Sequence, residues 1–343
     1  MNLNIVFDMK GCPNRCKHCW LGHMENKNLH ESDASFVVDK FSKYYDKITF
    51  YSWLREPDFC QDYRDRWNKD IKLSSGNKPI RFELASFYKI VREPDYVNFL
   101  KEVGTKKVQL TFFGMKDLTD KYVGRKGAFD ELVRATDILI KNGITPRWQA
   151  FINQENKDEI VSLLDLVDQL EIKERCKDFS FFVHAGSCDG ENAKLYNIRI
   201  NKKDIPSKLV PYYLDYENVA TESELYNLLI NNNGYFVPSN DNDITINITN
   251  TFDVYFNFTH INESWKIGNL KTDNMEEIVR RINEEDVLAL QIARKIPLSK
   301  LVSQYGDKNS DKVFEIEDFE MYLLNRHLEH ITQYDAAVQG KSN

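Results

Sequence analysis

The stretch MKGCPNRCKHCWLG at residues 9–22 places three of the six cysteines of the chain within eight positions, at Cys12, Cys16 and Cys19. A short apolar run at residues 3–8 precedes it and has the β-branched and aromatic content of a buried strand. We therefore expect a loop with three thiols at the carboxyl end of a first strand. In a barrel of parallel strands this end forms the mouth, where the functional groups gather.

The composition is that of a large globular protein. The chain has 343 residues, of which 42% are hydrophobic and 29% charged, enough to bury a sizeable core. The formal net charge is -7 and no run of Lys and Arg stands out, which argues against nucleic acid as a partner. The N-terminal apolar patch is too short for a signal peptide, and no apolar run reaches membrane-spanning length. We predict a cytoplasmic protein without a membrane partner.

In the cytoplasm thiols stay reduced, so closely spaced cysteines indicate metal ligands or catalysts before disulfides. A structural zinc ion takes four ligands, and His18 or His23 could complete a Cys3His site. An iron–sulfur cubane held by only three cysteines leaves one iron open to a substrate or cofactor. The residue types alone leave both kinds of site open.

Short β-branched or aromatic runs alternate with helical stretches through the first half of the chain. The helical stretch at residues 127–143 ends at Gly143, ahead of Pro146. This alternation predicts an α/β fold with parallel strands, a partial (β/α)6 TIM-type barrel, with a doubly wound open sheet as the competing layout. The six predicted strands span residues 3–8, 47–53, 79–85, 106–113, 145–151 and 178–185.

The pattern changes after residue 201. Residues 243–260 alternate as an antiparallel hairpin would, and the segments 274–296 and 314–331 are helical in their periodicity. We therefore predict a small α+β appendage and a helical tail behind the barrel. The expected domains are residues 1–201, 202–296 and 297–343.

The spacing Cys-x3-Cys-x2-Cys directly after a first strand resembles the signature loop of the radical S-adenosylmethionine (radical SAM) superfamily. The resemblance implies that Cys12, Cys16 and Cys19 bind a 4Fe-4S cluster whose fourth iron chelates S-adenosylmethionine. It also implies reductive cleavage of that cofactor to methionine and a 5'-deoxyadenosyl radical. His18, which precedes the third cysteine, would lie near the adenine, where the family favours an aromatic residue.

A second motif agrees with this resemblance. The segment Arg55-Glu56-Pro57 follows the predicted strand 47–53 and is similar to the Gly-Gly-Glu-Pro-like motif of the superfamily. The resemblance implies that Glu56 binds the ammonium group of the cofactor. Leu54 and Arg55 replace both glycines, which departs from the pattern. Without the cysteine loop, Glu-Pro would indicate only a surface turn.

The predicted strand 145–151 contributes two further candidates. Arg147 could pair with the cofactor carboxylate through a bidentate contact, although a solvated arginine before a strand is the alternative. Asn153 has the polar chemistry to line a barrel mouth and to contact the cofactor. Both are assigned to cofactor binding.

The C-terminal region resembles the SPASM group of the same superfamily, in which a hairpin and a helix hold auxiliary clusters. This chain has no cysteine around Val254, Tyr255 and Phe256, and none at all after Cys188. We therefore predict one cluster. The resemblance implies a peptide substrate, or else a small metabolite, and an external one-electron donor of the flavodoxin or ferredoxin type.

A chain without auxiliary clusters favours redox-neutral outcomes, such as epimerisation or rearrangement. A thiol S–H bond is weak, so Cys188, just beyond the last predicted strand, could donate a hydrogen atom to a substrate radical. Cys60 is the rival donor, and either residue could instead be a small buried hydrophobe. The competing classes of protein are a Cys3His zinc-binding partner protein and a catalytically degenerate member of the fold.

Overall fold

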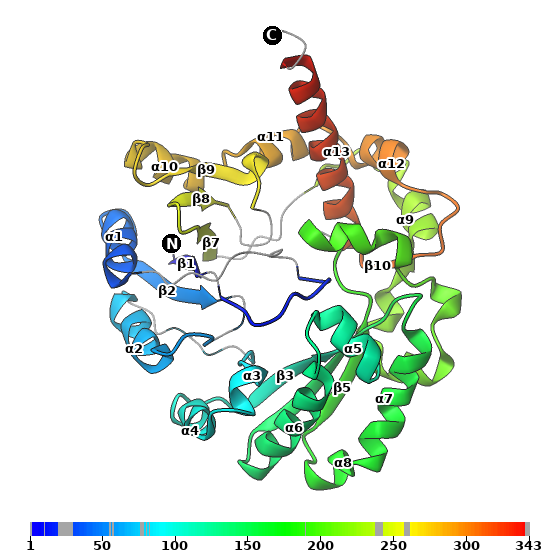
Figure 1. Cartoon of the computed structure of the whole chain (residues 1–343). Coiled ribbons are helices and arrows are strands. Elements are labelled where there is room, and N and C mark those ends of the chain that lie inside the picture. Colours follow the sequence, from blue (N-terminus) through cyan, green and yellow to red (C-terminus); the bar gives the residue numbers. More distant parts are fainter. Residues whose placement is uncertain are drawn as a thin grey trace.

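A computed structural model shows an α/β molecule in which helices flank the outer side of one mixed and one parallel sheet (Figure 1). The structure describes residues 2–9, 11–19, 30–54, 56, 58–75, 79, 81, 83–188, 190–236, 243–256 and 261–339. Its strands are β1 (Asn2–Met9), β2 (Lys47–Leu54), β3 (Lys107–Phe112), β4 (Thr145–Phe151), β5 (Ser180–His184), β6 (Ala220–Thr221), β7 (Asp243–Ile248), β8 (Asp253–Tyr255), β9 (Lys266–Asn269) and β10 (Val313–Phe314).

The helices follow the strands in the order expected for strand–helix units in the first half of the chain. The α-helices are α1 (Glu31–Phe41), α2 (Tyr63–Leu73), α3 (Phe87–Ile90), α4 (Pro94–Glu102), α5 (Lys116–Val123), α6 (Ala128–Lys141), α7 (Lys157–Gln169), α8 (Ile172–Arg175), α9 (Glu222–Leu229), α10 (Met275–Asn283), α11 (Leu288–Ala293), α12 (Leu298–Tyr305) and α13 (Ile316–Gln339). The 3-10 helices are η1 (Gly190–Ile198), η2 (Lys202–Asp204), η3 (Ser207–Tyr212), η4 (Tyr216–Asn218) and η5 (Glu263–Trp265).

The first sheet joins the N-terminal strands to strands from the later part of the sequence, residues 243–269. Its strand order is β2-β1-β7-β8-β9, with β1 parallel to β2 from Asn2↔Lys47 onward and parallel to β7 from Asn2↔Asp243. β7 and β8 pair antiparallel at Asn247↔Tyr255, which confirms the predicted hairpin in its described residues. Because strands cover both edges of β1, the loop that follows β1 starts from a fixed position.

The second sheet consists of β3, β4 and β5, all parallel. Its burial alternates along each strand: Val108 and Leu110 are buried towards the helices, while Gln109 and Thr111 on the other face are partly exposed. Such alternation is expected when one face of a sheet meets a helical layer and the other faces the barrel interior. The polar inner face predicts a lumen that hydrogen-bonding groups line.

Helix α6 illustrates how the outer layer forms. Phe129 and Leu132 are buried on one face, and the indole Nε1 of Trp148 on β4 donates a hydrogen bond of 2.8 Å to Thr136 Oγ1. The helix lies within residues 127–143, as its periodicity predicted. Burying a hydrophobic side chain of this size contributes roughly 1.5–3 kcal/mol, so packing against β4 stabilises the helix.

The prediction of a third strand at residues 79–85 is wrong, since its described residues form no strand. Arg81 turns to Asp58, with Nη2 2.6 Å from Oδ2, and Glu83 forms an ion pair with Arg147. One backbone hydrogen bond, from Gln109 N to Glu83 O at 2.7 Å, links the segment to β3. These side-chain pairs replace a regular ladder, and the two sheets are separate. The predicted partial barrel is confirmed as an open α/β arrangement without a closed barrel.

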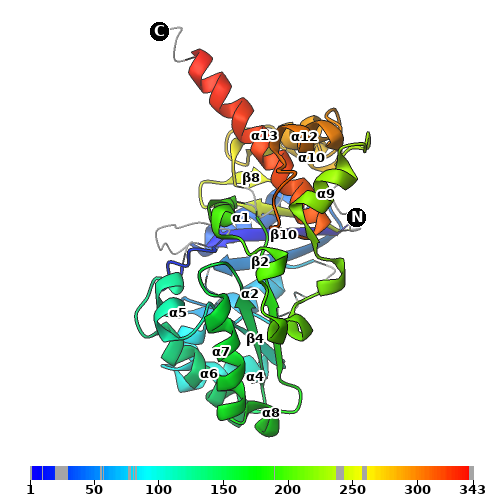
Figure 2. The same cartoon turned by 90° about the vertical axis from the view of Figure 1, so that its right-hand side faces the viewer.

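Two large apolar clusters fill the molecule. One packs β1, β2, β7, β8 and β9 against α1 and the helices α10 to α13, and the other packs β3, β4 and β5 against α4, α6 and α7. Figure 2 shows these two halves one above the other, with α13 projecting from the upper one. The helix predicted at residues 314–331 is confirmed as part of α13. The predicted domain division stays a prediction.

Among the described residues, no helix is both long enough and apolar enough to cross a membrane.

Candidate functional site

The three-cysteine loop follows β1 as expected. Cys12, Cys16 and Cys19 are all partly buried, and none of the six cysteines is in a disulfide. The backbone N–H of Asn14 points to Cys12 Sγ at 3.4 Å, and Cys19 N donates to Cys16 O at 3.2 Å. Backbone N–H groups near thiolate sulfurs stabilise negative charge, as iron–sulfur ligands require.

The end of helix α5 anchors this loop. Arg15 N donates to Val123 O at 2.9 Å and Lys17 N donates to Tyr122 O at 2.8 Å. These carbonyls belong to the last turn of the helix, which has no partners of its own for them. Gly124 follows with a φ of +70°, and a Cβ there would lie 2.8 Å from the carbonyl oxygen of Arg15. Only glycine lets the chain turn this close to the cysteine loop.

A single zinc ion does not fit the described geometry. In the described part of the chain, no group of three or more His, Cys, Asp or Glu side chains is arranged to hold one metal ion. The His18 ring packs 4.4 Å from Phe113 and 4.6 Å from Phe151, measured between ring centroids. His23 lies outside the described residues. The thiolates of a cubane bind different irons, so they need not converge on one point as zinc ligands must.

Glu56 lies beside the start of the cysteine loop. Its backbone N–H donates to Gly11 O at 2.9 Å, which ties the turn after β2 to the loop after β1. The side chain is 7% exposed, and Asn14 Nδ2 approaches Oε2 at 3.4 Å. Oε1 is buried without a hydrogen-bond partner of ordinary geometry among the described residues. Its neighbours Arg55 and Pro57 lie outside the described residues.

The environment of Glu56 favours a cationic ligand. Burial raises the pKa of Glu56 to about 7, against the opposing effects of Ser86, the Tyr88 backbone and the positive charge of Arg125. A buried carboxylate with an unsatisfied oxygen is costly unless a cation or donor reaches it. An ammonium group would meet both needs, since it is positively charged and carries three N–H donors. The site therefore fits the amino group of S-adenosylmethionine.

His18 is partly buried against an aromatic group. Phe113 stacks between Tyr122 and Phe151, with ring centroids 5.3 and 5.6 Å away, and His18 leans against this stack. Burial, together with a smaller effect of nearby His184, lowers the pKa of His18 to about 3, so the ring is neutral at pH 7. Its Nδ1 is buried without a hydrogen-bond partner among the described residues. A neutral aromatic wall of this kind suits a flat heterocycle.

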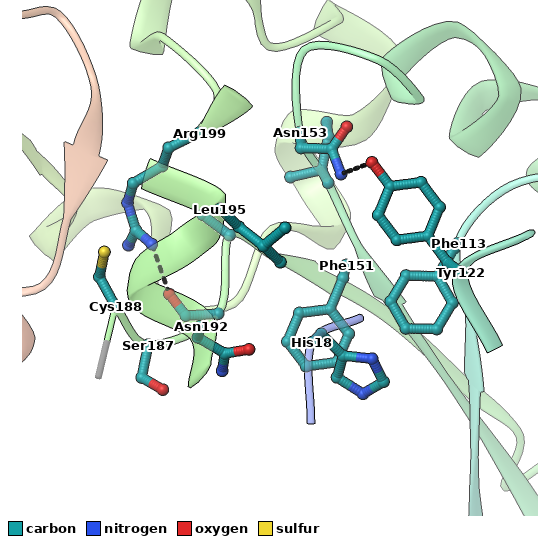
Figure 3. Close-up of a pocket in the computed structure, with 13 residues that line it drawn as sticks. His18, Phe113, Tyr122, Phe151, Asn153, Ser187, Cys188, Asn192, Leu195 and Arg199 are labelled. Atoms are coloured by element: carbon teal, nitrogen blue, oxygen red, sulfur yellow. Dashed lines mark hydrogen bonds between the residues drawn. The ribbon is translucent and has the colours of Figure 1, made fainter. Parts of the chain in front are cut away.

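A small cavity, partly open to solvent, adjoins His18 (Figure 3). On one side the Asn153 side chain donates from Nδ2 to the Tyr122 hydroxyl at 3.1 Å. On the other side the segment after β5 brings Ser187 and Cys188 to the wall. The lining residues are His18, Phe113, Tyr122, Phe151, Ile152, Asn153, Ala185, Gly186, Ser187, Cys188, Asn192, Leu195 and Arg199.

The structure brings His18, Asn153 and Cys188 together in this cavity, but it leaves two predicted site residues elsewhere. Arg147 lies four positions before the end of β4, where its Nη1 is 2.9 Å from Glu83 Oε2. Cys60 is buried, and burial raises the pKa of its thiol to about 12. Neither residue lines the cavity.

Sequence reasoning missed Arg199 and Asn192. Arg199 is 7% exposed and donates from Nη1 to Gly186 O at 2.8 Å, with its guanidinium over the Phe314 ring. Asn192 is buried, and its Oδ1 has no hydrogen-bond partner within the described ranges. Arg199 could have been suspected from the sequence because it lies between Ile198 and Ile200. A charged residue inside an apolar run usually has a function or a buried partner.

The site and fold define an α/β protein with a three-cysteine loop at the carboxyl end of its first parallel strand. The profile of the radical SAM superfamily matches residues 6–167. The matched segment contains the cysteine loop and Glu56, the two motifs on which the resemblance to this superfamily was predicted. The superfamily is one of enzymes that use a 4Fe-4S cluster and S-adenosylmethionine, which agrees with the two predicted cofactors.

Individual relatives are distant. The chain is 25% identical over 193 residues to the Fe-coproporphyrin III synthase of Methanosarcina barkeri (strain Fusaro / DSM 804). That match covers 53% of this chain and 44% of the relative, so it spans less than half of the relative's length.

Among solved structures, native anSMEcpe with bound AdoMet and Cp18Cys peptide is similar at a TM-score of 0.55 and 13% identity, covering 98% of this chain and 99% of that chain. The same enzyme with Kp18Cys peptide has a TM-score of 0.55 and 14% identity, covering 97% of this chain and 100% of that chain. These likenesses confirm the fold.

Proposed function

We propose that this protein is a radical SAM enzyme with one 4Fe-4S cluster on Cys12, Cys16 and Cys19. The observation that carries the proposal is the buried carboxylate of Glu56 beside the cysteine loop, which has no direct ion pair within the described part of the chain. When bound, the cluster and S-adenosylmethionine supply a 5'-deoxyadenosyl radical through one-electron reductive cleavage. An external donor of the flavodoxin or ferredoxin type would deliver the electron.

The residues of this chain would bind and orient the cofactor. Glu56 would accept hydrogen bonds from its ammonium group, and the neutral ring of His18 would lie against its adenine. Asn153, which Tyr122 and the Glu155 backbone hold in place at 3.1 and 2.8 Å, would present a fixed polar group at the same cavity. The aromatic wall would exclude water from this side and so protect a reactive carbon radical.

We propose a peptide as the substrate class, with a small metabolite as the second candidate. The peptide proposal draws support from the similar fold of anSMEcpe, which is described with bound peptides. The metabolite proposal draws support from the local similarity to an Fe-coproporphyrin III synthase. The polar inner face of β3 and β4, with Gln109, Thr111 and Gln149, provides hydrogen-bonding groups for either substrate.

We further propose a redox-neutral reaction in which Cys188 donates a hydrogen atom. Its S–H bond would break, a C–H bond would form on the substrate radical, and the sulfur radical would take one electron from the external donor and one proton from solvent. The position of Cys188 in the cavity wall supports this role over Cys60, which belongs to the apolar cluster around β3, β4 and β5 and does not line the cavity.

The first experiment tests the enzyme class. The full chain is purified without oxygen, reconstituted with iron and sulfide, and then given dithionite and S-adenosylmethionine. We expect about four irons per chain and release of 5'-deoxyadenosine. Bound zinc in place of iron, or iron without cofactor cleavage, would overturn the proposal in favour of a binding protein.

The second experiment tests Cys188 against Cys60, using peptides encoded near the gene as candidate substrates. Cys188→Ala should keep the iron content and the release of 5'-deoxyadenosine but lose the hydrogen-quenched product. Cys60→Ala is the matched control and should retain that product. Normal product from Cys188→Ala would refute the donor role.

A further inference from the structure

Asn14 connects two parts of the site that are far apart in sequence. It lies between Cys12 and Cys16 and is 3% exposed, an unusual burial for an amide side chain in a loop. Its Oδ1 accepts a hydrogen bond of 2.8 Å from Arg125 Nε, and its Nδ2 faces Glu56 Oε2 at 3.4 Å. One amide thus contacts both an arginine and the carboxylate of Glu56.

The donor and acceptor chemistry fixes the direction of this connection. A guanidinium can only donate, so the amide oxygen of Asn14 must face Arg125. The amide nitrogen must then face the carboxylate of Glu56, which can only accept when ionised. Arg125 therefore determines which group Asn14 presents to Glu56.

Arg125 is itself held on several sides. Its Nη1 donates to Glu131 Oε1 at 2.9 Å, and its guanidinium lies 5.4 Å from the ring centroids of Phe87 and Tyr88. It follows Gly124, the residue that turns the chain beside the cysteine loop. Arginine held in a planar geometry from several sides loses little further entropy when it donates a hydrogen bond. The arrangement is therefore preorganised.

We propose that Asn14 and Arg125 are positioning residues that hold the Glu56 carboxylate ready for the ammonium group of S-adenosylmethionine. This inference rests on the proposed function, because it assumes that Glu56 receives that group. If it is right, Asn14 and Arg125 fix the position of Glu56 relative to the cysteine loop.

The charges around Glu56 support this role. Arg125 is the cation that favours its ionised form, while burial and Asp58 oppose ionisation. The charge of Asp58 is largely balanced by Arg81, whose Nη2 lies 2.6 Å away. Tyr96 also donates to Asp58, at 2.6 Å, which leaves Arg125 as the cation acting on Glu56. Removing the positive charge at Arg125 should therefore raise the pKa of Glu56 and reduce cofactor binding near neutral pH.

The experiment measures the affinity for S-adenosylmethionine by calorimetry between pH 6 and pH 9, on anaerobically reconstituted full chain. Arg125→Met should weaken binding about fivefold at pH 7 and very little at pH 9, because a rise of about one unit in the pKa of Glu56 lowers its ionised fraction at pH 7 from about one half to about one tenth. Arg92→Met is the matched control: Arg92 also pairs with Glu131 but has no contact with Asn14. The affinity of Arg92→Met for S-adenosylmethionine should stay within about twofold of that of the wild type at every pH.

Asn14→Ala is the second variant and should show the same weakening with the iron content retained. An unchanged affinity and pH profile in Arg125→Met would overturn the proposal that Asn14 and Arg125 position Glu56. Loss of iron from both Arg125→Met and Asn14→Ala would also overturn it, because the pair would then only maintain the loop. If the wild type itself neither binds nor cleaves S-adenosylmethionine, the proposed function fails instead, so the two failures are distinguishable.

Discussion

Two glutamates of this protein each lie near an arginine, and they differ in almost every other respect. Glu56 is buried beside the cysteine loop and reaches Arg125 only through the amide of Asn14. Glu83, near the amino end of β3 and β4, has a side chain that is 41% exposed and pairs directly with Arg147 at 2.9 Å. The first carboxylate is buried without a direct ion pair among the described residues, while the second is partly exposed and has a cationic partner in direct contact.

The difference shows that a glutamate near an arginine can either bind a ligand or stabilise the fold. A direct, partly exposed ion pair contributes little, in the order of 0–1 kcal/mol, and leaves no capacity for a ligand. A buried carboxylate with a free oxygen is costly for the empty protein, and that cost is recovered when a cation binds. This contrast favours a role for Glu56 in cofactor binding and a structural role for Glu83.

The largest effect should come from the cysteine loop itself. Cys16→Ala removes one of three thiolate ligands, and we expect the iron content after reconstitution to fall close to zero and cofactor cleavage to stop. Cys176→Ala, at the end of α8 and away from the loop, is the control and should keep its iron. Iron and visible absorbance measure both variants. Four irons bound to Cys16→Ala would mean that other residues hold the cluster.

The next effect concerns stability and tests how costly Glu56 is without a ligand. Its pKa is about 7 in the folded chain, compared with 4.5 for an ordinary glutamate side chain. Between these values the unfolded chain has lost the proton and the folded chain keeps it, so stability must fall as the pH rises. We expect Glu56 to account for a loss of about 2 to 3 kcal/mol between pH 5 and pH 8 in the apoprotein.

Comparison with Glu56→Gln isolates this contribution, because burial also raises the pKa of Asp70 to about 7. Urea unfolding of both proteins at pH 5 and pH 8 gives the free energies. The decline should be shallower by about 2 to 3 kcal/mol in Glu56→Gln. Equal declines would show that Glu56 is already solvated or paired, and the contrast with Glu83 would disappear.

Cofactor affinity should respond more modestly to the same substitution. Glu56→Gln keeps the shape of the side chain but removes the charge that an ammonium group needs. A hydrogen bond to a charged group contributes about 1.5–3 kcal/mol, so we expect binding of S-adenosylmethionine to weaken about 10- to 100-fold. Glu83→Gln is the control, and calorimetry on the reconstituted protein distinguishes the two. Equal affinities in both variants would contradict the assignment of Glu56.

Several features of this fold and site could be predicted because they are local in the sequence. β-Branched and aromatic runs located β1 to β5, and the cysteine spacing and Glu56 were recognisable as motifs. The segment at residues 79–85 looked like a strand because its composition is that of a strand. The ion pair of Arg81 with Asp58 that holds it differently joins residues 23 positions apart, and no local pattern records such a contact.

The residues that complete the site are the ones that sequence could not assign. Arg125 and Asn14 are 111 positions apart, and only the turn after α5 brings them together. Arg147 was predicted to bind the cofactor because its position in a strand was visible in the sequence. Its ion pair with Glu83 was not visible there. Burial and pairing decide which arginine acts, and both are properties of the assembled fold.

The smallest effect should follow the loss of that predicted arginine. Arg147 pairs with Glu83, also donates to Gln109, and keeps a side-chain exposure of 31%. Arg147→Met should therefore change the affinity for S-adenosylmethionine less than about twofold and the free energy of unfolding by less than about 1 kcal/mol. If binding instead weakens tenfold or more, Arg147 reaches the cofactor in the loaded enzyme. The amino ends of β3 and β4 would then belong to the active site, and a satisfied ion pair would no longer indicate a structural role.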